Sequence, residues 1–198
     1  MLTGRTYESI LSDQVKTSES VLDLGCGRNS PIKRVPEIGY SVGVDGYRPY
    51  LLQSKREKAH GDYVLASLNH QCFRPRSFQT VVLLDVLEHL TKSDGYKIIE
   101  EMEKLATDKV VLFTPNGFLN QEDYEGNILQ THLSGWTAPE LEKRGFKVYG
   151  VNGAKFFRKE KAQLRINQRW FYELCFLSEK LVFRFPTLAF QLLAVKKA

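Results

Sequence analysis

Short apolar runs recur along the chain, and each is followed by a turn rich in glycine or aspartate and then by a helical pattern. Several of these runs are apolar without alternation, which is typical of parallel strands that are buried on both faces. The run VVLL at 81–84 is the clearest example. The pattern predicts strands at residues 20–24, 40–44, 77–84, 109–114 and 146–151, and a last strand at 188–196.

Amphipathic segments lie between the apolar runs. Residues 93–107 carry an apolar side chain at every third position from Tyr96 to Leu105, a one-faced stripe that predicts a helix. Another helix is predicted at 167–180, within a segment that departs from the earlier rhythm. The alternation of strands and helices favours a doubly wound α/β fold with a C-terminal helical insert before the last strand.

A further helix is predicted at residues 137–144, where the chain carries signals for both helix ends. Thr137 as N-cap and Glu140 three residues later fit a capping box. Gly145 fits the glycine that commonly follows the last helical residue.

Length and composition indicate an ordinary globular domain. A chain of 198 residues fits one hydrophobic core, so we expect a single domain over 1–198 with 155–186 as an insert. Hydrophobic residues at 42% and charged residues at 26% exclude a disordered or collagenous chain. The net charge of +5 is compatible with phosphorylated, nucleic-acid or anionic-membrane partners but requires none of them.

The cysteines and the apolar runs bear on the compartment. Cys26, Cys72 and Cys175 are an odd number without framework spacing, which indicates a reducing, cytoplasmic compartment. We expect neither a secretory signal nor a transmembrane segment, because no apolar run approaches the ~18 residues that a span requires. The oligomeric state is left open.

The first predicted strand ends in the sequence DLGCG at 23–27. In open α/β sheets ligands bind beyond the carboxyl ends of the strands, and the glycines there permit a tight turn and a close backbone approach. The second strand ends at Asp45, whose carboxylate can accept hydrogen bonds from both hydroxyls of a ribose. A dinucleotide-dependent oxidoreductase is the rival interpretation, but it requires a third glycine where this chain has Ser30.

These features, with Gly61-Asp62 after the expected third strand and FQTVVLLDVLEHL at 78–90, resemble class I S-adenosylmethionine (SAM)-dependent methyltransferases. The branch they resemble includes the ubiquinone-biosynthesis O-methyltransferases. The resemblance implies a Rossmann-like, seven-stranded, mostly parallel sheet with helices on both faces, and SAM as the cofactor. By position it implies these cofactor-binding residues: Asp23, Gly25, Cys26, Gly27, Asp45, Gly46, Asp62, Tyr63 and Asp85.

Acidic and imidazole side chains follow the fourth predicted strand directly. If residues 85–89 turn helically, Asp85, Glu88 and His89 lie on one face, at spacings of three and four. Two carboxylates and an imidazole on one face can bind a divalent cation.

A second resemblance concerns the same stretch. The motif at 85–89, the sequence TPN at 114–116 and His132 four residues before Trp136 resemble the small-RNA 3′-terminal 2′-O-methyltransferases. That resemblance implies a metal site, with Mg²⁺ or Mn²⁺ held by Asp85, Glu88, His89 and His132. The first ligand is aspartate where that family has glutamate, so its side chain is shorter.

Two interpretations without a metal stay open for these residues. His89 or His132 can act as a catalytic general base, since an imidazole with a pKa near neutral suits proton removal from a hydroxyl. Alternatively, Glu88 and His89 only form hydrogen bonds around the cofactor loop.

Two further segments are candidates for acceptor or partner contacts. The loop at 118–134 is long, and its polar residues Tyr124, Asn127, Gln130 and His132 suit a hydroxylated acceptor, although solvation explains them equally well. Residues 155–169 carry six cationic residues and precede an aromatic and leucine-rich stretch. That composition suits RNA, an anionic membrane surface, a phosphorylated acceptor, or packing with the cations in water.

The whole chain also resembles prokaryotic methyltransferases linked to glycan or small-molecule modification. We therefore expect O-methylation of a hydroxyl on a small molecule or a sugar. A metal-dependent RNA ribose 2′-O-methyltransferase is the alternative, although such enzymes usually carry further RNA-binding domains. A non-catalytic SAM-binding module is the alternative from another class, and the intact Asp23, Gly25, Gly27 and Asp45 argue against it.

Overall fold

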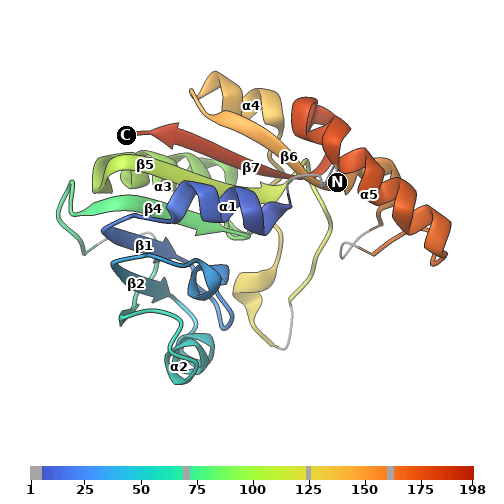
Figure 1. Cartoon of the computed structure of the whole chain (residues 1–198). Helices are drawn as coiled ribbons and strands as arrows, with labels where there is room; N and C mark the ends of the chain where they lie inside the picture. The colour runs from blue at the N-terminus through green and yellow to red at the C-terminus, as the bar shows by residue number, and fades with distance from the viewer. Residues whose placement is uncertain (1–5, 69–71, 124–125, 160–162) are drawn as a thin grey trace.

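Seven strands form one sheet in the order β3-β2-β1-β4-β5-β7-β6 in the computed structural model, which describes residues 6–68, 72–123, 126–159 and 163–198. Strands β1 to β5 pair in parallel, and β7 runs antiparallel to its neighbours β5 and β6. The predicted Rossmann-like, mostly parallel sheet is confirmed (Figure 1). The strands are β1 (Ser20–Leu24), β2 (Tyr40–Asp45), β3 (Asp62–Leu65), β4 (Phe78–Leu84), β5 (Ala106–Pro115), β6 (Lys147–Ala154) and β7 (Ala189–Lys197).

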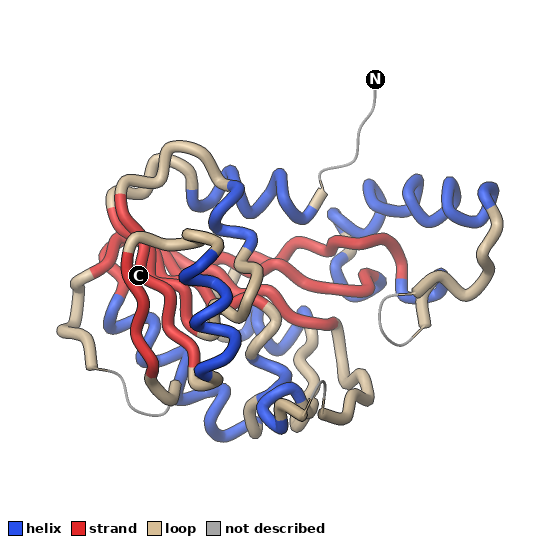
Figure 2. Tube along the Cα trace, turned by 90° about the horizontal axis from the view of Figure 1, so that it is seen from below, coloured by secondary structure: helices blue, strands red, loops and turns tan. Residues whose placement is uncertain are grey.

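Helices cover both faces of the sheet (Figures 1 and 2). On one face, Ile10, Leu11 and Val15 of α1 are buried against β1, β4 and β5. On the other face, the apolar stripe of α3 is buried, including Ile99 and Met102. Both faces of the central strands are therefore covered, which explains their unbroken apolar sequence. The α-helices are α1 (Tyr7–Val15), α2 (Arg48–Arg56), α3 (Lys92–Leu105), α4 (Ala138–Lys143) and α5 (Arg169–Arg184).

The six strands predicted by residue range and the three predicted helices all form, with ends shifted by a few residues. The helix predicted at 93–107 ends at Leu105, because Ala106 already begins β5. Helices α1 and α2 have no counterpart among the predictions, because neither carries a long apolar stripe. In α2 only Leu51 and Ser54 are buried.

Half of the capping box predicted at the start of α4 forms, since the Glu140 carboxylate accepts a hydrogen bond from the backbone N–H of Thr137. Thr137 is the N-cap residue, but its side chain makes no capping hydrogen bond. The carboxylate of Glu140 also accepts hydrogen bonds from Lys92 and Tyr96 of α3, both at 2.5 Å. Glu140 thus links the start of α4 to α3 as well as to its own N-cap residue. The predicted helix end is confirmed, since Gly145 adopts a φ of +87°.

The insert places α5 at the edge of the sheet, packed on β6 (Figure 1). Two glycines of β6 make this packing close. A Cβ on Gly150 would lie 2.2 Å from the carbonyl oxygen of Val182, and one on Gly153 would lie 2.6 Å from Sγ of Cys175. One face of α5 is buried through these contacts, while the opposite face is exposed. Among the described residues, no helix has the length and apolar character needed to cross a membrane.

Candidate active site

A cavity of about 750 Å³ opens at the carboxyl ends of the parallel strands. Its volume lies in the range that cofactor sites usually occupy. The loops after β1, β2 and β4 line it, as the switch-point rule for open sheets predicts. Six of the predicted cofactor-binding residues are among the lining residues: Gly25, Cys26, Gly27, Asp45, Gly46 and Asp85.

The loop after β1 is fixed by hydrogen bonds to β2. The amides of Gly25 and Cys26 donate to the carbonyl of Val44 at 2.8 and 2.9 Å. Gly25 has a φ of +73°, and a Cβ there would lie 2.5 Å from Cγ2 of Val86. Only glycine fits this position, which explains the first glycine of the motif.

Asp45 connects the loops that follow β1 and β2. Its Oδ2 accepts from the amide of Gly27 at 2.8 Å, and its Oδ1 accepts from the amide of Tyr47 at 2.7 Å. Burial raises the pKa of Asp45, and the two amide donors partly offset this effect. Each carboxylate oxygen can accept a second hydrogen bond, so the residue retains capacity for ribose hydroxyls.

Cys26 is a buried filler of the loop. Burial raises the pKa of its thiol, so no reactive thiolate forms near neutral pH. Its Sγ would lie 2.9 Å from a Cβ on Gly43. The glycine in β2 therefore makes room for this thiol, consistent with a packing role.

The structure puts Asp23 beneath the cavity, outside its lining. The side chain is buried and accepts a hydrogen bond from the hydroxyl of Ser30, the residue where a dinucleotide motif would require glycine. Nε2 of His60 lies 3.3 Å from the same carboxylate. Asp23 thus stabilises the glycine loop from below.

The prediction for Asp62 and Tyr63 is wrong, because they open β3 and do not follow it. The register pairs Asp45 with Leu65, so Asp62 lies at the opposite end of the strand from the cavity. Residues 67–68 occupy the position after β3 and line the cavity. The predicted third strand was placed too early because 62–65 lacks the apolar character of the other strands.

Both displaced residues have structural contacts instead. Asp62 accepts a hydrogen bond from the hydroxyl of Tyr40. The hydroxyl of Tyr63 donates to the carbonyl of Ser54 at 3.0 Å and accepts from the amide of His60 at 2.7 Å. These bonds anchor β3 to α2.

A second cavity of about 280 Å³ adjoins the first. Asp85, His89 and Gln130 line both, so these residues stand at the junction. The smaller cavity is lined mainly by polar side chains and by one aromatic ring. Its other lining residues are Glu88, Pro115, Leu119, Asn120, Gln121, His132, Phe190 and Gln191.

The expected helical face of Asp85, Glu88 and His89 does not form. Only Leu87–His89 turns, as a short 3₁₀ helix, and Asp85 before it has a φ of +53°. Asp85 instead accepts a long hydrogen bond from Gln191 of β7, at 3.4 Å. The prediction that these three residues share one face of a helix is therefore wrong.

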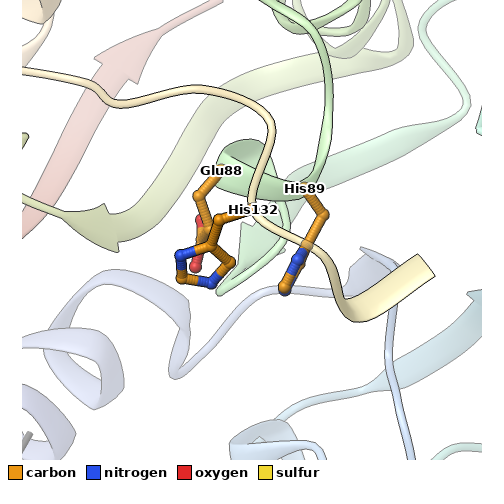
Figure 3. A group of neighbouring side chains, drawn as sticks. All are labelled: Glu88, His89 and His132. Atoms are coloured by element: carbon orange, nitrogen blue, oxygen red, sulfur yellow. The ribbon is translucent and has the colours of Figure 1, made fainter. Parts of the chain in front are cut away.

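Glu88, His89 and His132 nevertheless converge (Figure 3). One possible ligand atom from each lies within 4.8 Å of those of the other two. His132 comes from the loop that precedes α4, 43 positions away in sequence from His89. Asp85 does not belong to this group of three. Three of the four predicted ligands are thus brought together.

The hydrogen bonds of the two histidines determine which ring nitrogen carries the proton. Nδ1 of His89 lies 3.2 Å from the carbonyl oxygen of Thr131, and Nδ1 of His132 lies 2.8 Å from that of Leu119. Because a carbonyl only accepts, each Nδ1 is the protonated nitrogen in the neutral ring. Each Nε2 therefore retains a lone pair for a proton or a metal ion.

Burial shapes the charges of this group. It lowers the pKa of His89 to about 4, with a further contribution from His132, whose own pKa burial also lowers. Burial and the neighbouring Asp85 raise the pKa of Glu88 well above its usual value, although Thr114 donates to its carboxylate. Both imidazoles are therefore neutral at pH 7. A cation would reverse the effect on Glu88 by favouring its ionised form.

Trp136 holds the loop of His132 against the turn of Glu88. Its fully buried indole donates to the carbonyl of Leu87 at 3.2 Å and to the hydroxyl of Ser134 at 2.9 Å. The amides of Leu133 and Ser134 donate to the carbonyl of Glu88 at 2.8 and 3.0 Å. This anchoring role was not predicted from the sequence, in which Trp136 was used only to locate His132, four residues earlier.

Other residues near the cavities were also missed or have changed roles. Tyr7 of α1 lines the larger cavity and stacks on Phe113 at a centroid distance of 4.0 Å. The side-chain amide of Asn116 donates to the carbonyls of Pro186, Thr187 and Ala189, so it ties the end of β5 to the chain before β7.

The long loop contributes to the larger cavity through Asn127 and Gln130. The Asn127 side chain accepts from the amide of Leu129 at 3.1 Å and so shapes the loop. Tyr124 in this loop, and Lys161 in the insert, lie outside the described residues.

Comparisons with known proteins agree with this geometry. Residues 22–113 match the family model described as a methyltransferase domain. This range includes the loops after β1, β2 and β4 that line the larger cavity. Comparison with curated protein sequences finds no match.

Solved structures resemble the chain over nearly its whole length at low identity. A chain in the complex of the Haloferax volcanii Trm112 methyltransferase activator with a methyltransferase has a TM-score of 0.63 and 14% identity, covering 98% of this chain and 90% of that one. A SAM-dependent methyltransferase from Archaeoglobus fulgidus has a TM-score of 0.58 and 16% identity, covering 96% and 94%. The methyltransferase domain of a bacterial Hen1 has a TM-score of 0.54 and 18% identity, covering 96% and 94%.

The chain therefore has the Rossmann-like fold that these solved methyltransferases share, and its residues 22–113 match the methyltransferase domain model.

Proposed function

We propose that this protein transfers the methyl group of SAM to a hydroxyl group bound in the smaller cavity, with a divalent cation held by Glu88, His89 and His132. One observation carries the proposal. The three side chains converge in the wall of the smaller cavity, His89 also lines the larger one, and both Nε2 atoms retain a lone pair.

In this proposal SAM occupies the larger cavity. The carboxylate of Asp45 accepts hydrogen bonds from the ribose hydroxyls, and the loop at 25–27 lies against the methionine part. The sulfonium methyl then points toward the junction with the smaller cavity. Positioning the acceptor in line with the methyl group supplies much of the rate enhancement of such a reaction.

The donor set fits a cation by its chemistry. Two imidazoles with unprotonated Nε2 and one carboxylate are ligands that suit Mn²⁺ and related divalent ions better than Mg²⁺, which prefers oxygen. When bound, such an ion lowers the pKa of a coordinated hydroxyl. The carbonyls of Thr131 and Leu119 fix the ring orientations, as outer partners of metal-bound histidines commonly do.

The acceptor in this proposal is a hydroxylated small molecule or a single sugar unit. Four side-chain amides can hydrogen-bond hydroxyl groups around the smaller cavity, and the ring of Phe190 offers an apolar face. The volume of about 280 Å³ suits one ring-sized group. The polar lining residues are Asn120, Gln121, Gln130 and Gln191.

A terminal ribose 2′-hydroxyl of RNA is a second candidate acceptor. The convergence of Glu88, His89 and His132 favours it, and so does the fold similarity to a bacterial Hen1 methyltransferase domain. Ribose presents two neighbouring hydroxyls. These suit a cation site as well as the neighbouring hydroxyls of another sugar do.

A tritiated-methyl transfer assay tests the proposal. Pooled glycans, small phenols and small RNAs are each incubated with the protein and labelled SAM, with EDTA and then with added Mn²⁺ or Mg²⁺. We expect transfer to a hydroxylated acceptor, loss of transfer in EDTA and recovery with Mn²⁺. Oligonucleotides with and without a terminal 2′-hydroxyl distinguish RNA from a small molecule. SAM binding without transfer to any pool would instead indicate a binding module.

A further inference from the structure

The exposed face of α5 carries a continuous apolar stripe. Trp170, Leu174, Leu177 and Leu181 follow one another at spacings of four, three and four residues, so they lie along one side of the helix. Their exposed fractions are 53, 44, 64 and 50%, in the order Trp170, Leu174, Leu177 and Leu181. Phe185 extends the stripe beyond the helix and is 55% exposed.

These five half-exposed side chains present an apolar patch on the order of 400–600 Å², about as large as the largest patch on a typical monomer. The stripe is not the face that attaches α5 to the sheet. That contact is made by Phe171, Cys175 and Val182, which are each at most 5% exposed. The stripe thus lies on an exposed flank of the helix, next to the face that packs on the sheet, at the periphery of the molecule (Figure 1).

The charge of the whole chain is concentrated around this helix. Residues 155–185 hold eight Lys and Arg against three Glu, while the rest of the chain holds 20 of each sign, so this segment accounts for the entire net charge of +5. On α5 itself, Arg169, Lys180 and Arg184 are exposed and border the stripe along one side, where Glu173 pairs with Arg169 at 3.2 Å and leaves Lys180 and Arg184 as the excess positive charge. Their long side chains can extend to anionic groups while the stripe is buried.

We propose that α5 is an interfacial helix that docks the protein on an anionic phospholipid bilayer surface. An apolar face containing tryptophan and leucine beside a cationic border is the pattern of helices that lie in the membrane interface. Each Lys or Arg near such a surface adds attraction to anionic lipids. The inference does not rest on the proposed methyl transfer, because none of these residues lines either cavity.

The charge and the side-chain types disfavour the other occupants. A second copy of the chain would bring two segments of the same net charge together, which is repulsive. An RNA strand would meet the cations and could stack on Trp170 and Phe185, but the three leucines between them offer no aromatic face for stacking bases. An anionic bilayer would bury the apolar stripe and attract the neighbouring cations.

Vesicle flotation with the full-length protein tests the proposal. We expect binding to vesicles of phosphatidylglycerol and phosphatidylcholine, little binding to pure phosphatidylcholine, and a decrease as salt rises. Leu177→Ser with Leu181→Ser should lower the partition coefficient about tenfold or more, as should Lys180→Glu with Arg184→Glu. The matched controls lie on α2: Leu52→Ser, whose leucine is 44% exposed, and Lys55→Glu with Arg56→Glu. These controls should bind as the unchanged protein does.

The proposal is overturned if the protein fails to float with anionic vesicles, or if the α5 and α2 variants lose binding equally. It is also overturned if light scattering shows a dimer that only the stripe variant disrupts, in the absence of vesicle binding. Thermal unfolding of each variant verifies that the exposed substitutions leave the fold intact.

Discussion

The imidazole rings of His89 and His132 meet edge to face with their centroids 4.8 Å apart, and each ring donates its Nδ1 proton to a backbone carbonyl. This relationship gives both residues the same free nitrogen, Nε2, beside the buried carboxyl of Glu88. It also brings two histidines into contact that are both neutral at pH 7, so their proximity carries no charge repulsion. The proposed O-methylation depends on this arrangement.

Methyl transfer should increase with pH and then level off below neutrality. Each histidine must be neutral to offer Nε2, and its pKa is lowered from the ordinary value of 6.5, to about 4 for His89. Protonation therefore removes activity only as the pH falls well below 6.5. A rate profile from pH 4.5 to 8 under saturating SAM and saturating Mn²⁺, which keeps the proposed ligand Glu88 ionised, measures this. An activity that keeps rising steeply above pH 7 would indicate a different titrating group.

Glu88→Gln should stabilise the metal-free protein at pH 7 to 8 while abolishing methyl transfer. The raised pKa of buried Glu88 means that the folded chain retains a proton that the unfolded chain releases above the ordinary value of 4.5. The unfolded state then binds fewer protons, so stability falls as the pH rises. Removing this titration should raise the free energy of unfolding by on the order of 1 kcal/mol.

Chemical denaturation in EDTA at pH 5 and pH 8 checks the effect of Glu88→Gln. The gain over the unchanged protein should be larger at pH 8. A variant that is less stable than the unchanged protein at both values would contradict the assigned environment of Glu88.

Asp45→Ala should weaken SAM binding at least tenfold, about 1.4 kcal/mol. The substitution removes the predicted acceptor of the ribose hydroxyls and also the anchors of Gly27 and Tyr47. Calorimetric titration measures the affinity, with Asp62→Ala as the matched control because Asp62 lies away from the cavity. Unchanged affinity in Asp45→Ala, or tight binding of NAD with none of SAM, would count against the assigned pocket.

Trp136→Phe should lower the turnover rate about tenfold or more while leaving SAM affinity nearly unchanged. The substitution keeps an aromatic ring but removes the indole N–H that bonds to Leu87 and Ser134. The loop of His132 is then less firmly attached to the turn of Glu88. Equal loss of SAM affinity and turnover would instead indicate a general disturbance of the fold.

Gly95→Ala should destabilise the protein by about 1–3 kcal/mol, although alanine is the better helix former. Gly95 lies within α3, and a Cβ there would lie 2.4 Å from Cζ2 of Trp136. Lys97→Ala, at an exposed position of the same helix, serves as the control and should cost little. Thermal unfolding compares the two variants.

The fold could be predicted from the sequence because its strands are apolar throughout and its glycine turns fall at their ends. Strand β3 was misplaced because Asp62–Leu65 is an edge strand and is only partly buried, which removes the apolar signal. The error assigned Asp62 and Tyr63 to the cavity end of the strand, whereas they lie at its start. The position of Asp85 could not be predicted either, because a φ of +53° in an aspartate depends on the chain around it.

The convergence of His132 with Glu88 and His89 depends on tertiary contacts. Sequence spacing brings only Glu88 and His89 together. The buried Trp136 attaches the loop of His132 to the turn that carries them. The prediction of His132 as a ligand rested on the resemblance to the small-RNA 2′-O-methyltransferases. Which nitrogen of His89 and of His132 carries the proton follows only from the backbone carbonyls that the two rings contact. The exposed stripe of α5 likewise required the structure, since composition alone does not tell which apolar residues face the sheet.

The most direct test of the account measures methyl transfer to the identified hydroxyl acceptor by the unchanged protein and by His132→Ala, each in EDTA and after addition of Mn²⁺. The account predicts no transfer by the unchanged protein in EDTA and recovery with Mn²⁺. It predicts that His132→Ala stays at least a hundredfold slower than the Mn²⁺-restored unchanged protein, with or without Mn²⁺, while its SAM affinity is unchanged. Full transfer in EDTA, or normal transfer by His132→Ala, would contradict it.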